Sequence, residues 1–175
     1  MPQGPKVIKG RKVTGLPVLE REQGSTLGAV RELLYDDEGR RVEAVLLEEG
    51  SWFKGAKVVR WGDVLDVTEN GVTVPSQTVI QDTREEKELA DLSKHRQGLR
   101  GYKLINDAGE ELGIIEDILF DPVTGHVLGC ELSQGVVQDL LEGRWEALLP
   151  EDLVVRENTL LISQGEAEIF QPDSG

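Results

Sequence analysis

A ten-residue stretch occurs twice in this chain and limits what the chain can fold into. The first copy spans residues 27–36 (LGAVRELLYD) and the second spans residues 112–121 (LGIIEDILFD). The copies align Gly with Gly, Val with Ile, Tyr with Phe and Asp with Asp, and glycine and aspartate are eight positions apart in both. A β-rich run between a glycine and an acidic turn residue, written twice, indicates that one small β unit has been duplicated.

Similar segments surround both copies. Residues 15–19 and 101–105 predict a short opening strand, and Gly28 and Gly113 lie where a glycine marks a bend, a bulge or close backbone approach. The turns DDEG (residues 36–39) and DPVTG (residues 121–125) predict hairpins, the second with one extra residue before its glycine. Residues 41–47 and 126–132 then predict return strands. Under this alignment Val42, Ala44 and Leu46 match Leu128, Cys130 and Leu132 as core positions on one face.

The repeat sets the expected domain organisation of the 175 residues. We expect one β unit with a basic N-terminal tail over residues 1–80 and a second over residues 98–165, followed by an acidic tail over residues 166–175. Residues 81–97 predict a polar linker helix of about 12 residues, because Thr83 and Glu86 have capping-box spacing and Gly98 can end a helix. The copies differ most at residues 50–55, a short connection, and at residues 136–142, where apolar spacing predicts a helix.

Charge is unevenly distributed between the halves. The net charge is −14, and residues 1–80 carry 11 Lys and Arg against 12 Asp and Glu, whereas residues 81–175 carry 8 against 21. An acidic surface of this kind repels phosphate backbones, which argues against general nucleic-acid binding by the second half. The exception is a basic arm formed by Lys6, Lys9, Arg11 and Lys12. This arm is either a solvated tail or a segment that contacts RNA, anionic lipid or the acidic second half.

The composition argues for a cytoplasmic protein without a membrane span. No apolar run approaches the roughly 20 residues that cross a bilayer, and the N-terminal residues lack the apolar region of a secretory signal. The single cysteine, Cys130, excludes an internal disulfide and a CxxC motif.

A short strand, a Leu-Gly run that ends in an acidic residue, a glycine hairpin and a final strand after an Asp step resemble the PRC-barrel domain over residues 12–75 and 98–163. That domain is the small β-barrel of the photosynthetic reaction-centre H subunit's cytoplasmic part and of the C-terminal half of the ribosome maturation factor RimM. The arrangement is most similar to stand-alone bacterial proteins of this family. The resemblance implies an all-β fold of two tandem small barrels joined by a helical linker. It also implies a module that docks onto other macromolecules, and it transfers no catalytic residues.

The sequence offers little support for enzyme chemistry, so we expect no catalytic, cofactor or metal site. It contains no GxSxG, HExxH, GxGxxG or Walker-type motif. His95 lies in the polar linker and His126 follows a hairpin glycine, where turn polarity explains it. Cys130 fits a small buried apolar position. The acidic turn at Asp36 lacks the alternating ligands and distal glutamate of a calcium loop.

The aromatic residues in the segments that differ between copies are the better candidates for a binding site. They either pack inside and between the units or form a surface that docks a protein partner. The residues of this hypothetical docking surface are Trp52, Phe53, Trp61 and Trp145, with Val137, Leu140 and Leu141 of the predicted helix as a second part. We therefore predict a non-catalytic docking or assembly module whose protein partner the sequence does not identify. Association into a homo-oligomer is left open. The alternatives are a ribosome- or RNA-processing factor that uses the basic arm, and a binder of a small ligand.

Overall fold

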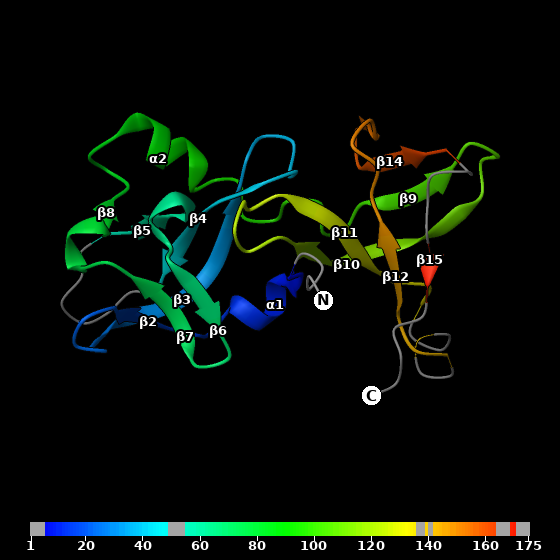
Figure 1. The fold of residues 1–175 in the computed structure, drawn as a ribbon. Helices are drawn as coiled ribbons and strands as arrows, with labels where there is room; N and C mark the ends of the chain where they lie inside the picture. Colours follow the sequence, from blue (N-terminus) through cyan, green and yellow to red (C-terminus); the bar gives the residue numbers. More distant parts are fainter. Residues whose placement is uncertain (1–5, 49–54, 136–138, 140–141, 164–168, 171–175) are drawn as a thin grey trace.

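A computed structural model describes residues 6–48, 55–135, 139, 142–163 and 169–170. Its two halves each contain one sheet, and the order of strands within the two sheets is the same (Figure 1). The first sheet has the order β6-β7-β2-β3-β4-β5-β8 and the second the order β13-β14-β9-β10-β11-β12-β15. The duplication inferred from the sequence is therefore confirmed strand by strand.

The strand bounds follow the predicted segments closely. The first sheet contains β2 (Pro17–Glu20), β3 (Thr26–Tyr35), β4 (Val42–Leu47), β5 (Lys57–Arg60), β6 (Asp66–Thr68), β7 (Gly71–Val74) and β8 (Gln81–Asp82). The second contains β9 (Lys103–Asn106), β10 (Glu111–Phe120), β11 (Val127–Ser133), β12 (Trp145–Leu148), β13 (Val154–Arg156), β14 (Thr159–Ile162) and β15 (Ile169–Phe170). Among the described residues no pairing joins the two end strands of either sheet, so neither sheet closes into a barrel through hydrogen bonds.

The repeated glycines mark matching β-bulges. Between β2 and β3 the pairing passes from Gly28 to Thr26 on the long strand, and between β9 and β10 it passes from Gly113 to Glu111. Each bulge leaves one leucine without a cross-strand partner. Gly113 has a φ of 152°, and a Cβ there would lie 2.8 Å from the carbonyl oxygen of Ser133. The prediction that a glycine permits close backbone approach here is confirmed.

The strand register corrects the alignment of the return strands. Leu34 pairs with Ala44 and Leu119 pairs with Gly129, so Gly129 is the counterpart of Ala44. By the same register Cys130 matches Val45, because the two hairpins have equal length and differ only in where the glycine stands. Cys130 is fully buried, as predicted, but the alignment that placed it opposite Ala44 was one residue out.

The linker differs from its prediction in length and in burial. Its helix α2 covers only Lys87–Leu92, and the N-cap is Glu86, without a side-chain capping bond, so the predicted Thr83 capping box is wrong. Leu89 is fully buried and packs with a cluster formed by Leu34, Ala44, Leu46 and Val58. The linker is therefore part of the first half's core and covers one face of its sheet. The other helical segments are α1 (Gly10–Val13) and the 3-10 turns η1 (Trp61–Asp63) and η2 (Gln77–Val79).

One apolar core runs through both halves. The largest cluster of buried residues includes Val45, Val59 and Tyr35 from the first half together with Phe120 and Cys130 from the second. Two small units that share a core bury more apolar surface than either would bury alone. Of the described helices, none is both long and apolar enough to cross a membrane.

Candidate functional site

The basic arm is built into the second half of the molecule. Strand β1 (Ile8–Lys9) pairs antiparallel with β10, with Ile8 opposite Phe120 and Lys9 opposite Leu119. The chain then turns through α1 and enters the first sheet at β2, so the arm connects the two halves (Figure 1). Of the three contacts that the sequence left open for the arm, the structure therefore shows the one with the acidic second half.

A buried glutamate holds the arm's cations. Lys9 Nζ lies 2.9 Å from Glu131 Oε2 and 3.1 Å from a carboxylate oxygen of Glu146. Arg11 forms an ion pair with Glu131, and Arg144 Nη1 approaches the same carboxylate at 2.9 Å. The Glu131 side chain is only 3% exposed. Among the other arm residues, Lys6 donates a 2.9 Å bond from Nζ to the carbonyl of Val67, and Lys12 is exposed.

These acids replace an apolar surface of the first half. The register makes Glu131 the counterpart of Leu46, and Glu146 the counterpart of Val58. In the first half, Leu46 and Val58 are covered by Leu89 of α2. In the second half the same face is acidic and is covered by the basic arm. The copies therefore cover equivalent faces by different physical means, one by apolar burial and one by ion pairing.

The electrostatics of Glu131 follow from this environment. Burial by itself would raise the pKa of Glu131, but hydrogen bonds from Arg11, Lys9 and Arg144 outweigh it and lower the pKa from 4.5 to about 2. The same ion pairs raise the pKa of Arg11 and of Arg144 against the desolvation that lowers it. The carboxylate is therefore fully ionised near neutral pH.

The halves contact each other in a reciprocal way. The segment before β2 pairs with β10 of the second half, and the segment before β9 contacts β3 of the first, where the Tyr35 amide donates a 2.9 Å bond to the carbonyl of His95. The two hairpins meet at a bridge between Arg41 and His126, which occupy equivalent positions. The halves therefore exchange contacts reciprocally, as the two subunits of a dimer do when equivalent segments contact each other.

Trp61 belongs to this contact between the halves. It is 5% exposed, its ring meets Phe120 edge-on at 5.3 Å, and its Nε1 donates a 3.0 Å bond to the carbonyl of Pro122. On the other side of the contact, Arg40 donates to the carbonyl of Pro150 at 3.0 Å. The placement of Trp61 on an exposed docking surface is wrong, and the alternative of inter-domain packing is the one observed.

The other predicted docking residues give less information. Trp145 is half-buried against the main core, and its Nε1 is buried without a hydrogen-bond partner among the described residues. Trp52, Phe53, Val137, Leu140 and Leu141 lie outside the residues that the structure describes.

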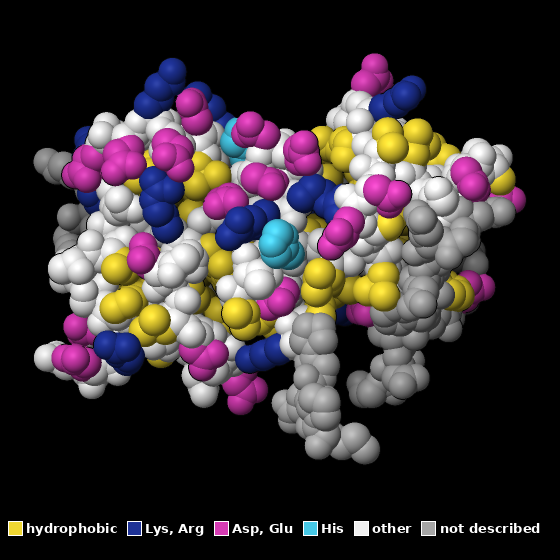
Figure 2. All heavy atoms as spheres, turned by 45° about the horizontal axis from the view of Figure 1, so that its top comes forward, with side chains coloured by type: hydrophobic (Ala, Val, Ile, Leu, Met, Phe, Trp, Pro, Cys, Tyr) yellow, Lys and Arg dark blue, Asp and Glu magenta, His cyan; other side chains and the backbone are white. Residues whose placement is uncertain are grey.

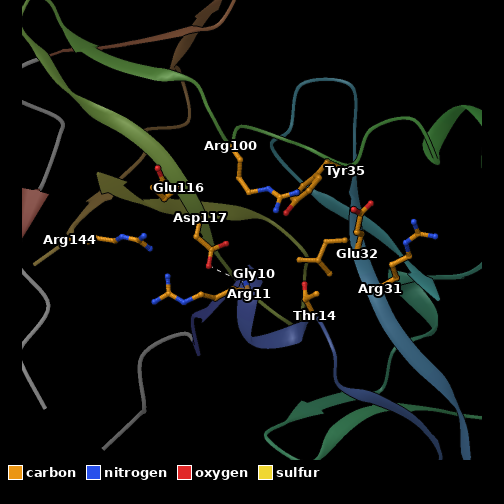
Figure 3. A pocket seen from close by; sticks show the side chains of 11 residues that line it. Gly10, Arg11, Thr14, Arg31, Glu32, Tyr35, Arg100, Glu116, Asp117 and Arg144 are labelled. Carbon is orange, nitrogen blue, oxygen red and sulfur yellow. Dashed lines mark hydrogen bonds between the residues drawn. The ribbon is translucent and has the colours of Figure 1, made fainter. Parts of the chain in front are cut away.

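A polar cleft of about 380 Å³ lies where the two halves meet (Figure 3). Its walls come from α1, β3, β10 and the loop before β9. Gly10 allows α1 to approach β10 closely, because a Cβ there would lie 2.8 Å from Asp117 Oδ1. The lining is rich in charge of both signs: Arg11, Arg31, Arg100 and Arg144 with Glu32, Glu116 and Asp117.

A second concave surface adjoins the edge of the second sheet. Among the described strands β13 pairs only with β14, and Val154 and Val155 are 45% and 39% exposed. A groove of about 440 Å³ runs beside this strand and is lined by apolar residues that include Ile105, Leu153 and Leu161. Hydrophobic side chains are visible over this half of the molecule, on the right of the space-filling view (Figure 2).

Comparison with known proteins gives the family. The PRC-barrel domain matches residues 5–86 and 96–156, which is most of the chain and one match for each half. The chain belongs to the PRC-barrel family. No curated protein matches it. The first match includes the arm that pairs with the second half, and the second match begins one residue after His95, whose carbonyl accepts the bond from Tyr35.

Two of the remaining chemical candidates, His95 and Cys130, have their surroundings defined by the structure. His95 Nε2 lies 3.1 Å from Asp37 on the surface, and burial raises the pKa of the Cys130 thiol to about 12. Within the described part of the PRC-barrel protein, no three His, Cys, Asp or Glu side chains are grouped so as to hold a metal ion.

Three charged residues of the contact between the halves, Glu131, Arg100 and Glu32, were not predicted from the sequence as site residues. Glu131 had a usable signal, since it is a lone acid in the buried run Cys130–Leu132 of a strand. Arg100 and Glu32 had none, because their neighbours in the cleft come from segments far away in the chain.

Proposed function

We propose that this PRC-barrel protein is a non-catalytic docking module, and that an extended segment of a protein partner binds along the β13 edge of its second domain. The observation that carries the proposal is the exposed apolar edge strand beside a 440 Å³ groove. An edge strand presents unpaired backbone N–H and C=O groups, and natural proteins cover or charge such edges unless they are used for pairing.

The comparison between the two domains supports this assignment. The corresponding edge of the first domain is β6, where Val67 is 6% exposed and its carbonyl accepts the Lys6 Nζ bond, with polar Asp66 and Thr68 on either side. The first edge is therefore polar and capped by a side chain. The second edge presents two exposed valines, which favours binding at the second domain only.

Charge around the groove indicates the chemistry of the partner. Asp107 and Asp152 line the groove, and Glu151 is exposed beside it. A partner segment that alternates apolar and basic residues would place one face in the groove and the other against these acids. The arm's engagement with Glu131 favours docking over the RNA alternative, because Lys9 and Arg11, two of its four cations, already have a carboxylate partner within the chain.

The proposal can be tested with an eight-residue peptide that alternates Val and Lys, with binding to the full chain measured by fluorescence anisotropy. We expect Val154→Asp to weaken binding about tenfold or more, because it would place a carboxylate in the groove against the apolar face of the bound segment. Val123→Asp is the matched control, since Val123 is 86% exposed on the β10–β11 hairpin and does not line the groove. A peptide methylated at alternate backbone nitrogens should also lose affinity, because strand addition needs those N–H groups.

Equal binding by the two valine variants would refute the groove as the docking surface. If the methylated peptide bound as well as the parent, charge attraction alone would explain the affinity and strand addition would be excluded. Quantitative comparison of proteins purified with the wild type and with both variants then identifies the natural partner, a second copy of the chain being one outcome.

A further inference from the structure

The cleft lies where the two domains meet and is lined by residues of both. Its lining includes equivalent positions of the two copies: Arg31 corresponds to Glu116, and Glu32 corresponds to Asp117. Matching bulges in β3 and β10 establish this correspondence. Arg100 stands one residue before Gly101, whose amide bonds to β10 as the amide of Gly15 bonds to β3. Equivalent backbone positions thus carry different side chains, so duplication has produced an asymmetric, charged site where a simple repeat would have a symmetric one.

Arg100 supplies this cleft with a cation that no carboxylate neutralises among the described residues. Its Nε donates to the carbonyl of Gln97 at 3.2 Å and its Nη2 to the carbonyl of Arg96 at 2.8 Å. These bonds fix the guanidinium, which reaches toward Tyr35 in the cleft (Figure 3). No bond from Nη1 is present in the described part of the chain, so this nitrogen retains its two donors.

The other wall of the cleft contains an acceptor that needs a donor. Glu32 Oε2 is buried and has no hydrogen-bond partner among the described residues. Arg96 forms an ion pair with this oxygen, but its Nε is 3.7 Å away, beyond hydrogen-bond reach. A carboxylate oxygen left without a donor is costly. The Glu32 side chain is 36% exposed as a whole, so a turn of its carboxylate would present this oxygen to a hydroxyl group of a molecule bound in the cleft.

We infer that the cleft binds a small oxyanion that also carries a hydroxyl donor, such as a phosphorylated or hydroxycarboxylic metabolite. The planar guanidinium of Arg100 binds the anionic oxygens, and Glu32 Oε2 accepts the hydroxyl proton. The volume of about 380 Å³ is within the range of small-molecule sites. Arg11 and Arg144 add positive potential, although Glu131 holds their side chains in ion pairs. This site is separate from the β13 groove and its ligand is independent of the docking partner.

Inorganic phosphate and sulfate test both halves of this inference at once. At pH 8 both are predominantly dianions, but hydrogen phosphate carries a hydroxyl and sulfate does not. We expect ¹H–¹⁵N NMR titration of the full chain at constant ionic strength to show saturable shifts of the Arg100 Nε–H signal, with phosphate binding about tenfold more tightly than sulfate. Glycolate against acetate repeats the comparison for carboxylates, and the pair with the tighter member identifies the class of oxyanion.

Variants separate a built site from general charge attraction. Arg100→Gln should weaken phosphate binding about tenfold, and Arg100→Lys should restore part of it, whereas Arg21→Gln, an exposed arginine outside the cleft, should change nothing. Glu32→Gln should remove the preference for phosphate, because an amide can donate to sulfate. Binding that Arg100→Gln leaves unchanged would show an adventitious ion only and overturn the inference. The absence of saturable shifts with all four anions would overturn it as well. So would equal affinity for the two members of both pairs, phosphate with sulfate and glycolate with acetate.

Discussion

Replacing Glu131 by glutamine tests whether an ion cluster holds the N-terminal arm on the second domain. The substitution keeps the shape of the side chain and removes its charge. Lys9, Arg11 and Arg144 would then surround a neutral amide at a position that is 3% exposed. Each cation is at least one quarter exposed and can turn toward water, but β1 must remain paired with β10 to keep Lys9 in place.

The expected loss of stability is about 3 kcal/mol at pH 7. Lowering the pKa of Glu131 from 4.5 to about 2 corresponds to roughly this free energy, at 1.36 kcal/mol for each pKa unit. Removing one partner of a buried ion pair costs about 3–5 kcal/mol, and partial exposure of the cations places the value at the lower end.

The dependence on pH provides the more specific result. The pKa of Glu131 is lower in the folded state, so the unfolded state binds the proton more readily and the stabilisation is complete only above about pH 4.5. As the pH falls from 5 towards 2, the difference in the free energy of unfolding between wild type and Glu131→Gln should shrink towards zero. Urea denaturation followed by tryptophan fluorescence measures this difference, because Trp61 is buried between the domains.

The control is Glu151→Gln, which removes one exposed carboxylate and should change the free energy of unfolding by less than about 0.5 kcal/mol. A Glu131→Gln effect below about 1 kcal/mol at pH 7 would refute the proposed role of the cluster. A difference that stayed constant down to pH 2 would mean that lost packing, not lost charge, explains the effect.

Three further outcomes follow from burial and backbone geometry. Leu89→Ala should destabilise the protein by about 2–4 kcal/mol in urea denaturation, because Leu89 is fully buried on the first sheet; an effect under 1 kcal/mol would mean that α2 is not part of the core. Gly125→Ala should lower the melting temperature by several degrees, since its φ is 81° and a Cβ would lie 2.5 Å from the Val42 carbonyl, whereas Gly109→Ala, with open space around it, is the milder control. The Cys130 thiol should react with a disulfide reagent only after unfolding, because burial raises its pKa to about 12, and rapid reaction of the native protein would contradict its burial.

The sequence predicted the features that depend on neighbouring residues. Glycines at bulges, aspartates that open turns and short β-rich runs act through local backbone conformation, so the strands of both domains and the bulges at Gly28 and Gly113 could be read from the chain. Local sequence placed Cys130 at the position equivalent to Ala44, which is one residue out. The glycine occupies different places in two hairpins of equal length, and only the pairing of strands fixes the register.

The linker shows why burial is harder to predict than strand position. Three of the six residues of Lys87–Leu92 are charged, and the local sequence does not predict that Leu89 is a core residue. The outer face of the first sheet, with Leu46 and Val58, creates that requirement. A single leucine suffices because the apolar surface that it covers belongs to the sheet and not to the helix.

By itself, the sequence determined that two copies of one β unit exist, where their turns lie and that positive charge gathers at one end, since each of these is a property of residues close together in the chain. Tertiary structure alone decided that the basic arm pairs with Glu131, that Trp61 joins the domains, and that Arg100 and Glu32 face one cleft. The physical reason is that these contacts join segments separated by many residues. The exchange of segments between the domains brings these residues together, and the local conformational preferences of the chain do not encode that exchange.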